Sequence, residues 1–140
     1  MAEINAPAVD IFVKNLQERC EGLFYMSESE YPLEPIIFEV PEAVVITNLT
    51  VLKLANQPEA APVEVVDLPY FFRNQTADVP DADEFIQNMT NKFRDLQTFL
   101  QTQLQDVKVY RIGKREIQVY ALGKLSESHL AGFKTVSVET

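Results

Sequence analysis

Residues 107–140 read VKVYRIGKREIQVYALGKLSESHLAGFKTVSVET, and this stretch decides the fold. Three runs in it alternate apolar and polar residues and are rich in β-branched and aromatic side chains: 107–112, 116–122 and 132–140. Glycine turns separate the runs at Gly113-Lys114 and at Gly123. This pattern is typical of adjacent antiparallel strands. We therefore expect three neighbouring strands that form the middle of a sheet.

The last predicted strand runs to Thr140. We expect the carboxylate and hydroxyl groups of this residue to be fixed to a rigid element, because terminal residues are ordered when a sheet ties them down. An acidic strand end held in this way is suited to probing a site on another protein.

Length and composition predict one globular domain over residues 1–140. The chain is 46% hydrophobic and 24% charged, which is an ordinary globular balance. Its single cysteine, Cys20, excludes an internal disulfide, and no apolar run approaches the roughly 18 residues of a membrane span. We expect a soluble cytoplasmic protein in which Cys20, on the apolar stripe of the first helix, is a buried and inert thiol.

The formal net charge is −9, with a pI near 4.5. This excess of acid argues against binding nucleic acid or an anionic membrane through a basic face. It favours a basic partner, although a net charge away from zero also keeps small domains soluble.

The pattern upstream of these strands predicts helices and strands in mixed order. Helices are expected at 7–21, ended by Gly22, and in one turn after Asp67 that covers the core rings of Phe71 and Phe72. Strands are expected at 33–40, at a sheet edge because of Pro35, and at 63–66. A long helix is marked by an apolar face of Phe85, Met89, Phe93, Leu96, Leu100 and Leu104.

Three segments between these elements are less regular. Residues 44–54 fit either a short helix capped by Thr47 or a strand, and we favour the helix. Residues 27–32 and 74–83 are predicted to be polar, acidic loops. Bulky apolar residues at 23–26 fasten the first loop, so it is presented rigidly. The element order indicates an α+β fold with helices covering the sheet.

No arrangement of residues in the sequence indicates an enzyme. His129 is the one histidine, predicted to be solvated in a turn, and zinc clusters, phosphate loops and nucleophile elbows are absent from the sequence. Glu28 and Glu30 lie too close in one loop to form a glycosidase pair. The cluster at 81–84 lacks the glycine and the distant glutamate of a calcium loop. We expect no catalytic residue, no cofactor and no metal site of the protein's own.

The chain resembles the cyanobacterial nuclease A inhibitor (NuiA-like) family. The motifs that carry the resemblance are GLFYMSESEYP at 22–32, VVDLPYFF at 65–72, VYRIG at 109–113 with VYALG at 119–123, and the segment from LAG at 130–132 through VET at 138–140. Together they run from the end of the first helix to the last residue.

The resemblance implies a three-layer α/β/α sandwich, similar to that of the pathogenesis-related-1 (PR-1) proteins, with a mixed or antiparallel central sheet. It implies a protein that inhibits a sugar-nonspecific, Mg²⁺-dependent DNA/RNA endonuclease by covering its active site in a 1:1 complex. By matching motif, Glu28 would take the place of a substrate phosphate, and Thr140 would reach the Mg²⁺ of the nuclease. The neighbouring residues expected to bind the partner are Ser27, Ser29, Glu30 and Glu139.

The chemistry of such a site agrees with this implication. A nuclease presents arginine and a hard divalent cation to phosphate, and carboxylate or hydroxyl oxygens on a rigid acidic protein satisfy both without offering a scissile bond. The negative charge would also speed the encounter with a basic groove.

One feature departs from the family. Its inhibitor carries a tryptophan in the loop before the long helix, whereas this chain has none, so residues 74–83 must make a different contact. The alternative is a non-inhibitory protein interaction module on the same fold. An enzyme would have to use Glu28, Glu30 or His129, and no spacing among them favours catalysis.

Overall fold

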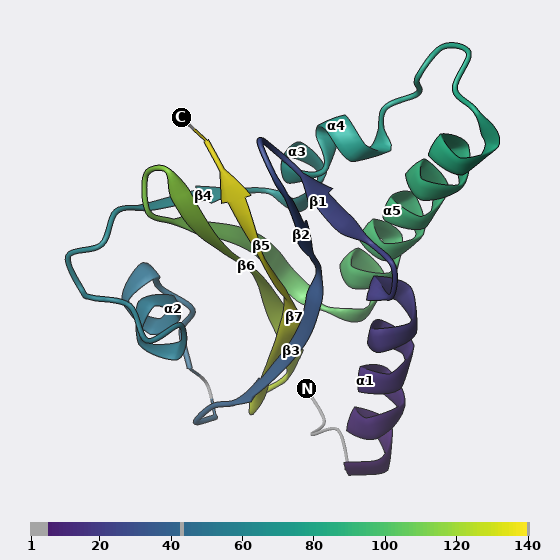
Figure 1. The fold of residues 1–140 in the computed structure, drawn as a ribbon. Coiled ribbons are helices and arrows are strands. Elements are labelled where there is room, and N and C mark those ends of the chain that lie inside the picture. Colours follow the sequence, from purple (N-terminus) through teal and green to yellow (C-terminus); the bar gives the residue numbers. More distant parts are fainter. Residues whose placement is uncertain (1–5, 43, 140) are drawn as a thin grey trace.

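A computed structural model describes residues 6–42 and 44–139 (Figure 1). Its helices are α1 (Ala6–Cys20), α2 (Asn48–Leu54), α3 (Leu68–Phe71), α4 (Arg73–Thr76) and α5 (Glu84–Gln103). Its strands are β1 (Phe24–Met26), β2 (Glu30–Pro32), β3 (Glu34–Glu39), β4 (Val63–Val66), β5 (Gln105–Ile112), β6 (Glu116–Ser126) and β7 (His129–Val138). The predicted α+β class is confirmed.

The main sheet has five strands in the order β3-β7-β6-β5-β4, and each neighbouring pair is antiparallel. The three strands predicted from residues 107–140 are β5, β6 and β7, and they form the middle of this sheet. β3 pairs with β7 alone and lies at an edge, as the proline at position 35 predicted. β1 and β2 form a separate two-stranded hairpin.

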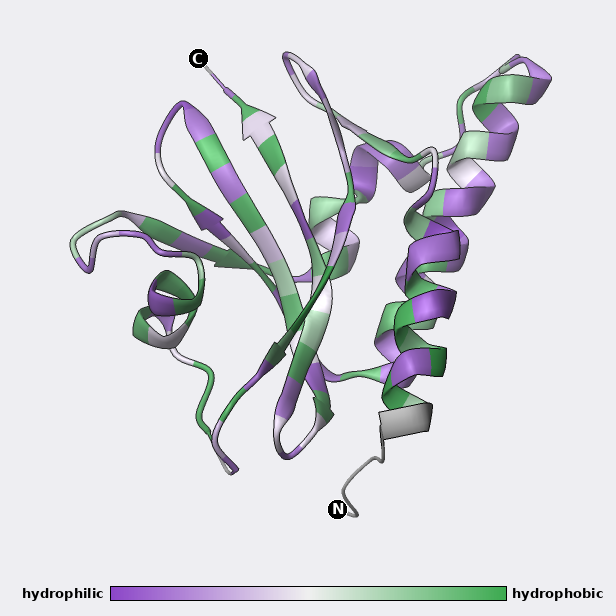
Figure 2. Cartoon of the chain, turned by 60° about the horizontal axis from the view of Figure 1, so that its bottom comes forward, coloured by the Kyte–Doolittle hydropathy of each residue, from purple (hydrophilic) through white to green (hydrophobic). Residues whose placement is uncertain are grey.

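Helices pack on both faces of the sheet (Figures 1 and 2). On one face, α1, α3 and α5 bury a large apolar cluster against the strands, with Leu16 and Leu96 at its centre. On the other, Val51 and Leu52 of α2 pack on Tyr110, Ile112 and Leu122. Successive strand residues alternate between these clusters because side chains along a strand point to opposite faces.

The turn expected at Gly123 is wrong, because β6 continues through this glycine to Ser126 and β7 already begins at His129. A Cβ atom on Gly123 would lie 2.8 Å from Val107 Cγ2 and 2.9 Å from Leu104 Cβ. The glycine therefore permits close approach of the segment entering β5 and does not make a turn.

Segment 44–54 resolves in favour of the helix over residues 48–54. Thr47 Oγ1 accepts a hydrogen bond from the backbone N–H of Thr50 at 3.2 Å, which is the geometry of an N-cap. Val51 and Leu52 are buried as a consequence, on the face of the sheet opposite α5.

Two predicted loops are partly ordered. Residues 30–32 of the first form β2, which pairs with β1. Residues 74–76 of the second belong to α4, so only residues 77–83 connect it to α5. Asp83 caps α5 by accepting a hydrogen bond from Ile86 N–H at 2.9 Å.

The apolar face predicted for α5 is correct in its C-terminal part and wrong at its beginning. Phe93, Leu96, Leu100 and Leu104 are buried, whereas the side chain of Phe85 is 71% exposed. The first turns of α5 extend beyond the sheet (Figure 1). The apolar residues therefore continue at helical spacing in a part of the helix that has no core to pack against.

Candidate partner-binding surface

The hairpin of β1 and β2 presents Glu28 at its tip. The strands pair as far as Met26 and Glu30, and the tip is closed by a hydrogen bond from Ser27 N–H to the Ser29 carbonyl at 2.9 Å. This short tip leaves the side chain of Glu28 exposed.

The tip is bound to the end of β7. Glu28 N–H donates to the carbonyl oxygen of Val138 at 3.2 Å, and Val138 N–H donates to Ser27 Oγ at 3.0 Å. Both backbone hydrogen-bonding groups of Val138 are thereby committed to the hairpin. The acidic tip and the terminal strand, far apart in sequence, are neighbours in the fold.

The other side of the hairpin is fixed to the helical layer. Gln75 Nε2 in α4 donates to the Met26 carbonyl oxygen at 3.1 Å. The ring of Tyr25 stacks on Phe71, with centroids 4.3 Å apart and an interplanar angle of 7°. Because Phe71 is only 2% exposed, the hairpin is anchored in the main core.

Glu139 is held by charged and polar partners within the molecule. Arg111 Nη2 donates to its Oε2 at 2.6 Å, and Ser137 Oγ donates to the same oxygen at 2.8 Å. Partial burial alone would raise the pKa of Glu139. The two hydrogen bonds and the positive charges of Arg111 and Arg73 more than offset that effect, so the pKa lies below its ordinary value.

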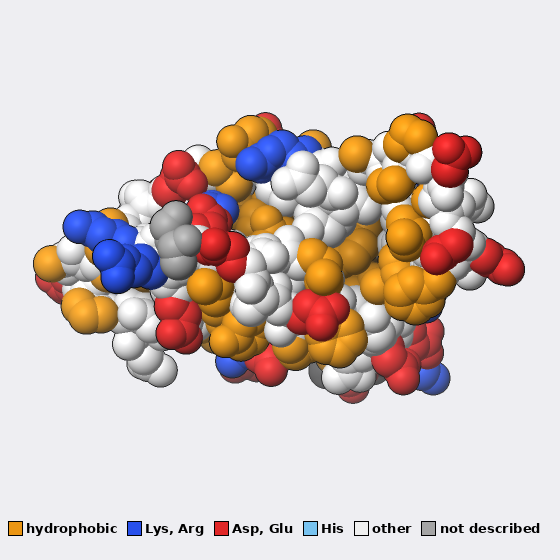
Figure 3. Space-filling model, turned by 45° about the horizontal axis from the view of Figure 1, so that its top comes forward, with side chains coloured by type: hydrophobic (Ala, Val, Ile, Leu, Met, Phe, Trp, Pro, Cys, Tyr) orange, Lys and Arg blue, Asp and Glu red, His pale blue; other side chains and the backbone are white. Residues whose placement is uncertain are grey.

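An open cleft of about 560 Å³ is lined by the hairpin and the end of β7 together with residues of β4, β5, α3 and α4. Its lining includes Glu28 and Glu139 together with Arg111 and Arg73, and the guanidinium of Arg73 stacks on the Tyr70 ring at 3.9 Å. Figure 3 shows this end of the molecule, where acidic side chains are spread among hydrophobic and neutral ones. The chemistry of the surface is that of a charged contact area with an apolar surround.

The residues predicted to bind a partner have different environments. Ser27, Glu28 and Glu139 come together beside the cleft. Glu30 is exposed on β2, and the hydroxyl of Ser29 is buried without a hydrogen-bond partner among the described residues. Thr140 lies outside the described residues.

Sequence reasoning missed Arg111. This residue is two positions from Val109, which is fully buried, so the strand period puts both side chains on the face covered by α1, α3 and α5. A charged residue in that row requires a partner carboxylate, and that requirement is a signal the sequence did contain.

Other groups with catalytic potential are engaged or inert. His129 was expected to be solvated in a turn, but it begins β7, and its Nδ1 lies 2.8 Å from Ser126 Oγ and 3.2 Å from Ser128 Oγ. The expected burial of Cys20 is confirmed, and this burial raises the pKa of its thiol to about 12, which disfavours the reactive thiolate. Over residues 6–42 and 44–139, His, Cys, Asp and Glu side chains form no cluster of three or more suited to a metal.

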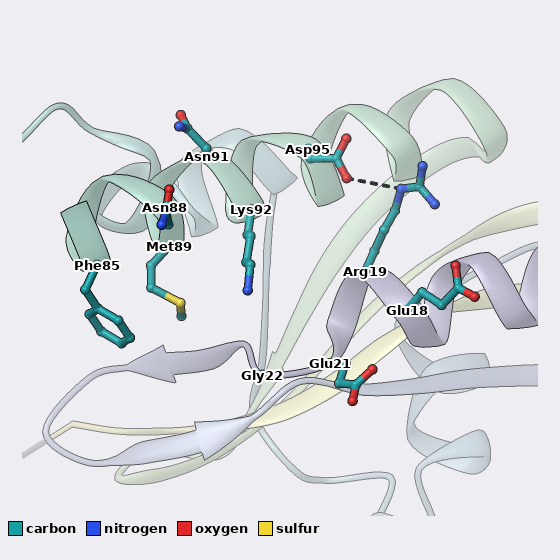
Figure 4. A pocket seen from close by; sticks show the side chains of 10 residues that line it. All are labelled: Glu18, Arg19, Glu21, Gly22, Phe85, Asn88, Met89, Asn91, Lys92 and Asp95. Carbon is teal, nitrogen blue, oxygen red and sulfur yellow. Dashed lines mark ion pairs between the residues drawn. The ribbon is translucent and has the colours of Figure 1, made fainter.

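A larger cleft of about 920 Å³ lies between α1 and the first half of α5 (Figure 4). Arg19 Nε and Asp95 Oδ2 form an ion pair across it at 3.2 Å, and Phe85, Met89 and Lys92 extend from α5 towards the hairpin. These side chains include no nucleophile paired with a base, so the cleft offers no catalytic arrangement. Within the described part of the chain, none of the helices has an apolar stretch that could cross a bilayer.

Comparison with known proteins identifies the family. No curated protein matches the chain. The family model described as "Nuclease A inhibitor-like protein" matches residues 10–140, which include every strand, the hairpin tip and the end of β7. The chain therefore belongs to the nuclease A inhibitor-like family.

Proposed function

We propose that this protein inhibits a sugar-nonspecific, Mg²⁺-dependent endonuclease by inserting its hairpin tip and the end of its last strand into the active site. The family suggests a nuclease inhibitor in general, which acts by binding a protein partner. The observation that carries the specific proposal is the pair of hydrogen bonds that join Ser27 and Glu28 to Val138.

Glu28 is the proposed phosphate mimic. Its carboxylate is exposed at the tip of a hairpin whose backbone is fixed on both sides, by β7 and by α4. A tip whose backbone is already fixed loses little backbone freedom on binding, and its carboxylate can accept hydrogen bonds from arginine as a phosphate oxygen does. Thr140 is the proposed contact with the nuclease Mg²⁺, because it follows Glu139 in the sequence, and Glu139 lines the same cleft as Glu28.

We further propose that residues 1–140 form one domain with the three-layer α/β/α architecture of the PR-1 proteins, and that it binds the nuclease 1:1. Packing of helices on both faces of the antiparallel sheet supports this architecture. The family match over residues 10–140 supports a single unit.

Cleavage of plasmid DNA by such a nuclease, with the protein added at a stoichiometric amount, tests the function. We expect cleavage to stop, and undiminished digestion by a panel of sugar-nonspecific nucleases would contradict the proposal. Glu28→Gln and removal of Thr140 should each weaken binding by about 2–5 kcal/mol, because each leaves partner charge unpaired.

Glu39→Gln is the matched control. It removes the same charge from an exposed residue at the other end of the sheet, where Glu39 of β3 lies opposite His129 at the start of β7. We expect binding within about 0.5 kcal/mol of wild type, the usual range for an exposed side chain away from the contact. Equal losses in both variants would indicate that net charge, and not the position of Glu28, determines affinity.

The second candidate function is a non-inhibitory interaction module. It is favoured by the absence of tryptophan and by exposed apolar side chains, Val79 and Phe85, in and after the 77–83 connection. A stable complex with a protein that is not a nuclease, formed with no effect on DNA cleavage, would support this alternative.

A further inference from the structure

Arg111 is a largely buried cation on β5 that contacts β4 and the residue following β7. Its side chain is only 16% exposed. Its Nη2 contacts Glu139 Oε2 at 2.6 Å, and its Nε lies 2.9 Å from Oε1 of Glu64, the residue opposite it on β4. The contact with Glu64 is an ion pair without hydrogen-bond alignment.

This arrangement is required by where the guanidinium lies. Arg111 lies on the face of the sheet that α1, α3 and α5 cover, together with Val109 and Val119. A charge that is largely removed from water is costly unless carboxylates accept its N–H groups. Glu139 supplies the shortest of these contacts, so its Oε2 is directed towards Arg111 while the side chain as a whole is 45% exposed.

Glu139 is in turn fixed at its backbone. Its N–H donates to the Arg115 carbonyl oxygen at 2.8 Å, and its Oε2 also accepts the Ser137 hydroxyl. β7 ends at Val138, so these contacts hold the residue that follows the strand. We call the set Arg111, Ser137 and Glu139 the terminal clamp.

The terminal clamp also controls the hairpin. Val138 lies between Ser137 and Glu139, and it is the residue whose N–H and carbonyl bind Ser27 and Glu28. Tyr25 of β1 lines the same cleft as Arg111 and Glu139. A movement of the clamp would therefore reach the hairpin tip through Val138 and Tyr25.

We propose that Arg111 is a positioning residue for partner binding: by holding Oε2 of Glu139, it sets the end of β7, and through Val138 the Glu28 tip, in the geometry that meets the partner. Glu139 then contributes through this clamp and not through contact of its Oε2 with the partner. This inference rests on the proposed function for one point only, namely that the partner is a nuclease.

Amide hydrogen exchange of the isolated protein tests the clamp directly. In Arg111→Gln we expect the Glu139 and Glu28 amides to exchange at least about tenfold faster relative to the core amide of Val119, because local opening no longer breaks an ion pair. Arg111→Lys keeps the charge and should restore part of the protection. Arg115→Gln is the matched control, because it removes an equal charge from an exposed side chain and leaves the Arg115 carbonyl in place.

Titration against the inhibited nuclease tests the consequence for binding. Arg111→Gln and Glu139→Gln should each weaken binding by about tenfold or more, and the double variant should bind no worse than the weaker single variant. Arg115→Gln should bind as wild type does. If Arg111→Gln does not fold, Ser137→Ala removes one donor to the same carboxylate and should shift the same two amides.

Two results would overturn the inference. Unchanged exchange of the Glu139 and Glu28 amides in both Arg111→Gln and Ser137→Ala would show that the clamp does not hold the surface. Additive losses of affinity in the double variant would show that Glu139 contacts the partner by itself. A wild-type protein that binds no nuclease would refute the proposed function, whereas the exchange experiment would still decide whether the clamp exists.

Discussion

The backbone N–H of Val138 donates to the hydroxyl oxygen of Ser27 at 3.0 Å, across a sequence separation of 111 residues. Glu28 N–H returns a hydrogen bond to the carbonyl oxygen of Val138. These contacts join two segments that are far apart in the sequence into one surface. The geometry of this surface therefore depends on single hydrogen-bonding atoms as well as on its charged groups.

Ser27→Ala should lower both the stability of the protein and its affinity for the partner, because it loosens the contact between the hairpin and β7. The substitution removes the acceptor for Val138 N–H, and a partly buried donor left without a partner costs about 1–3 kcal/mol. We expect a comparable loss in the free energy of unfolding, measured in urea, together with weaker binding to the inhibited nuclease.

Ser29→Ala is its control. The Ser29 hydroxyl is on the same tip but makes no hydrogen bond among the described residues, so its removal should leave stability within about 0.5 kcal/mol or raise it. A loss at Ser29 as large as that at Ser27 would show that the hydroxyl contact with Val138 is not the cause.

Gly132→Ala should be among the most destabilising single changes in the chain. Gly132 has φ of +156°, and an added Cβ would overlap the carbonyl oxygen of Ala121 on the neighbouring strand. Overlap with backbone in the centre of a sheet cannot be relieved by a rotamer change. We therefore expect the free energy of unfolding, measured in urea, to fall by about 3 kcal/mol or more.

Gly22→Ala provides the comparison in the same urea experiment. Gly22 also has positive φ, at +76°, but nothing lies within 4 Å of the added Cβ. Its cost should be about 1 kcal/mol, from the backbone conformation alone. Similar losses at both glycines would contradict the close approach of β6 and β7.

Phe85→Ala and Phe93→Ala should separate the two ends of α5. Phe93 is 2% exposed and its ring packs edge-on against Phe72 with centroids 5.2 Å apart, so its truncation should cost about 3–5 kcal/mol. Phe85 is mostly exposed and should change the free energy of unfolding by about 0.5 kcal/mol or less. A large loss at Phe85 would mean that this turn is buried in solution.

The terminal clamp should give the protein a defined response to acid. The pKa of Glu139 is lowered from its ordinary 4.5, so the ionised form is favoured by folding. The resulting stability is fully present above pH 4.5 and is lost as pH falls through the lower pKa of the folded state. Wild type and Glu139→Gln should therefore differ by a constant amount from pH 8 to about pH 5 and converge below pH 4.5.

Urea unfolding of both proteins across that range is the measurement. A difference that stays constant down to pH 2 would show that the carboxylate is not held by Arg111 and Ser137.

Much of the fold followed from local pattern. The alternation in residues 107–140 predicted the central strands, and the capping residues Thr47 and Asp67 predicted two helix starts that the structure confirms. These signals are strong because the capping side chain accepts a hydrogen bond from a backbone N–H only three residues away, whatever the tertiary structure.

The errors arose where tertiary contacts decide. Gly123 has the local appearance of a turn, but its role is set by Val107 and Leu104, which approach it from another segment. The exposure of Phe85 depends on where the sheet ends, which periodicity alone cannot reveal. The place of Arg111 in an apolar row indicated that it needs a carboxylate, but the sequence could not identify Glu139 as that partner, because the contact crosses an intervening strand.

The position of β7 has a consequence for how the protein is made. β7 lies between β3 and β6, so the edge strand has no neighbour in the main sheet until residues 129–138 have been synthesised. A nascent chain on the ribosome that has not reached this point holds its hairpin without the partner that sets Ser27 and Glu28. Incomplete translation products should therefore fail to inhibit the nuclease that we propose as the target, and only chains that include residues 129–138 can build the tip in its final geometry.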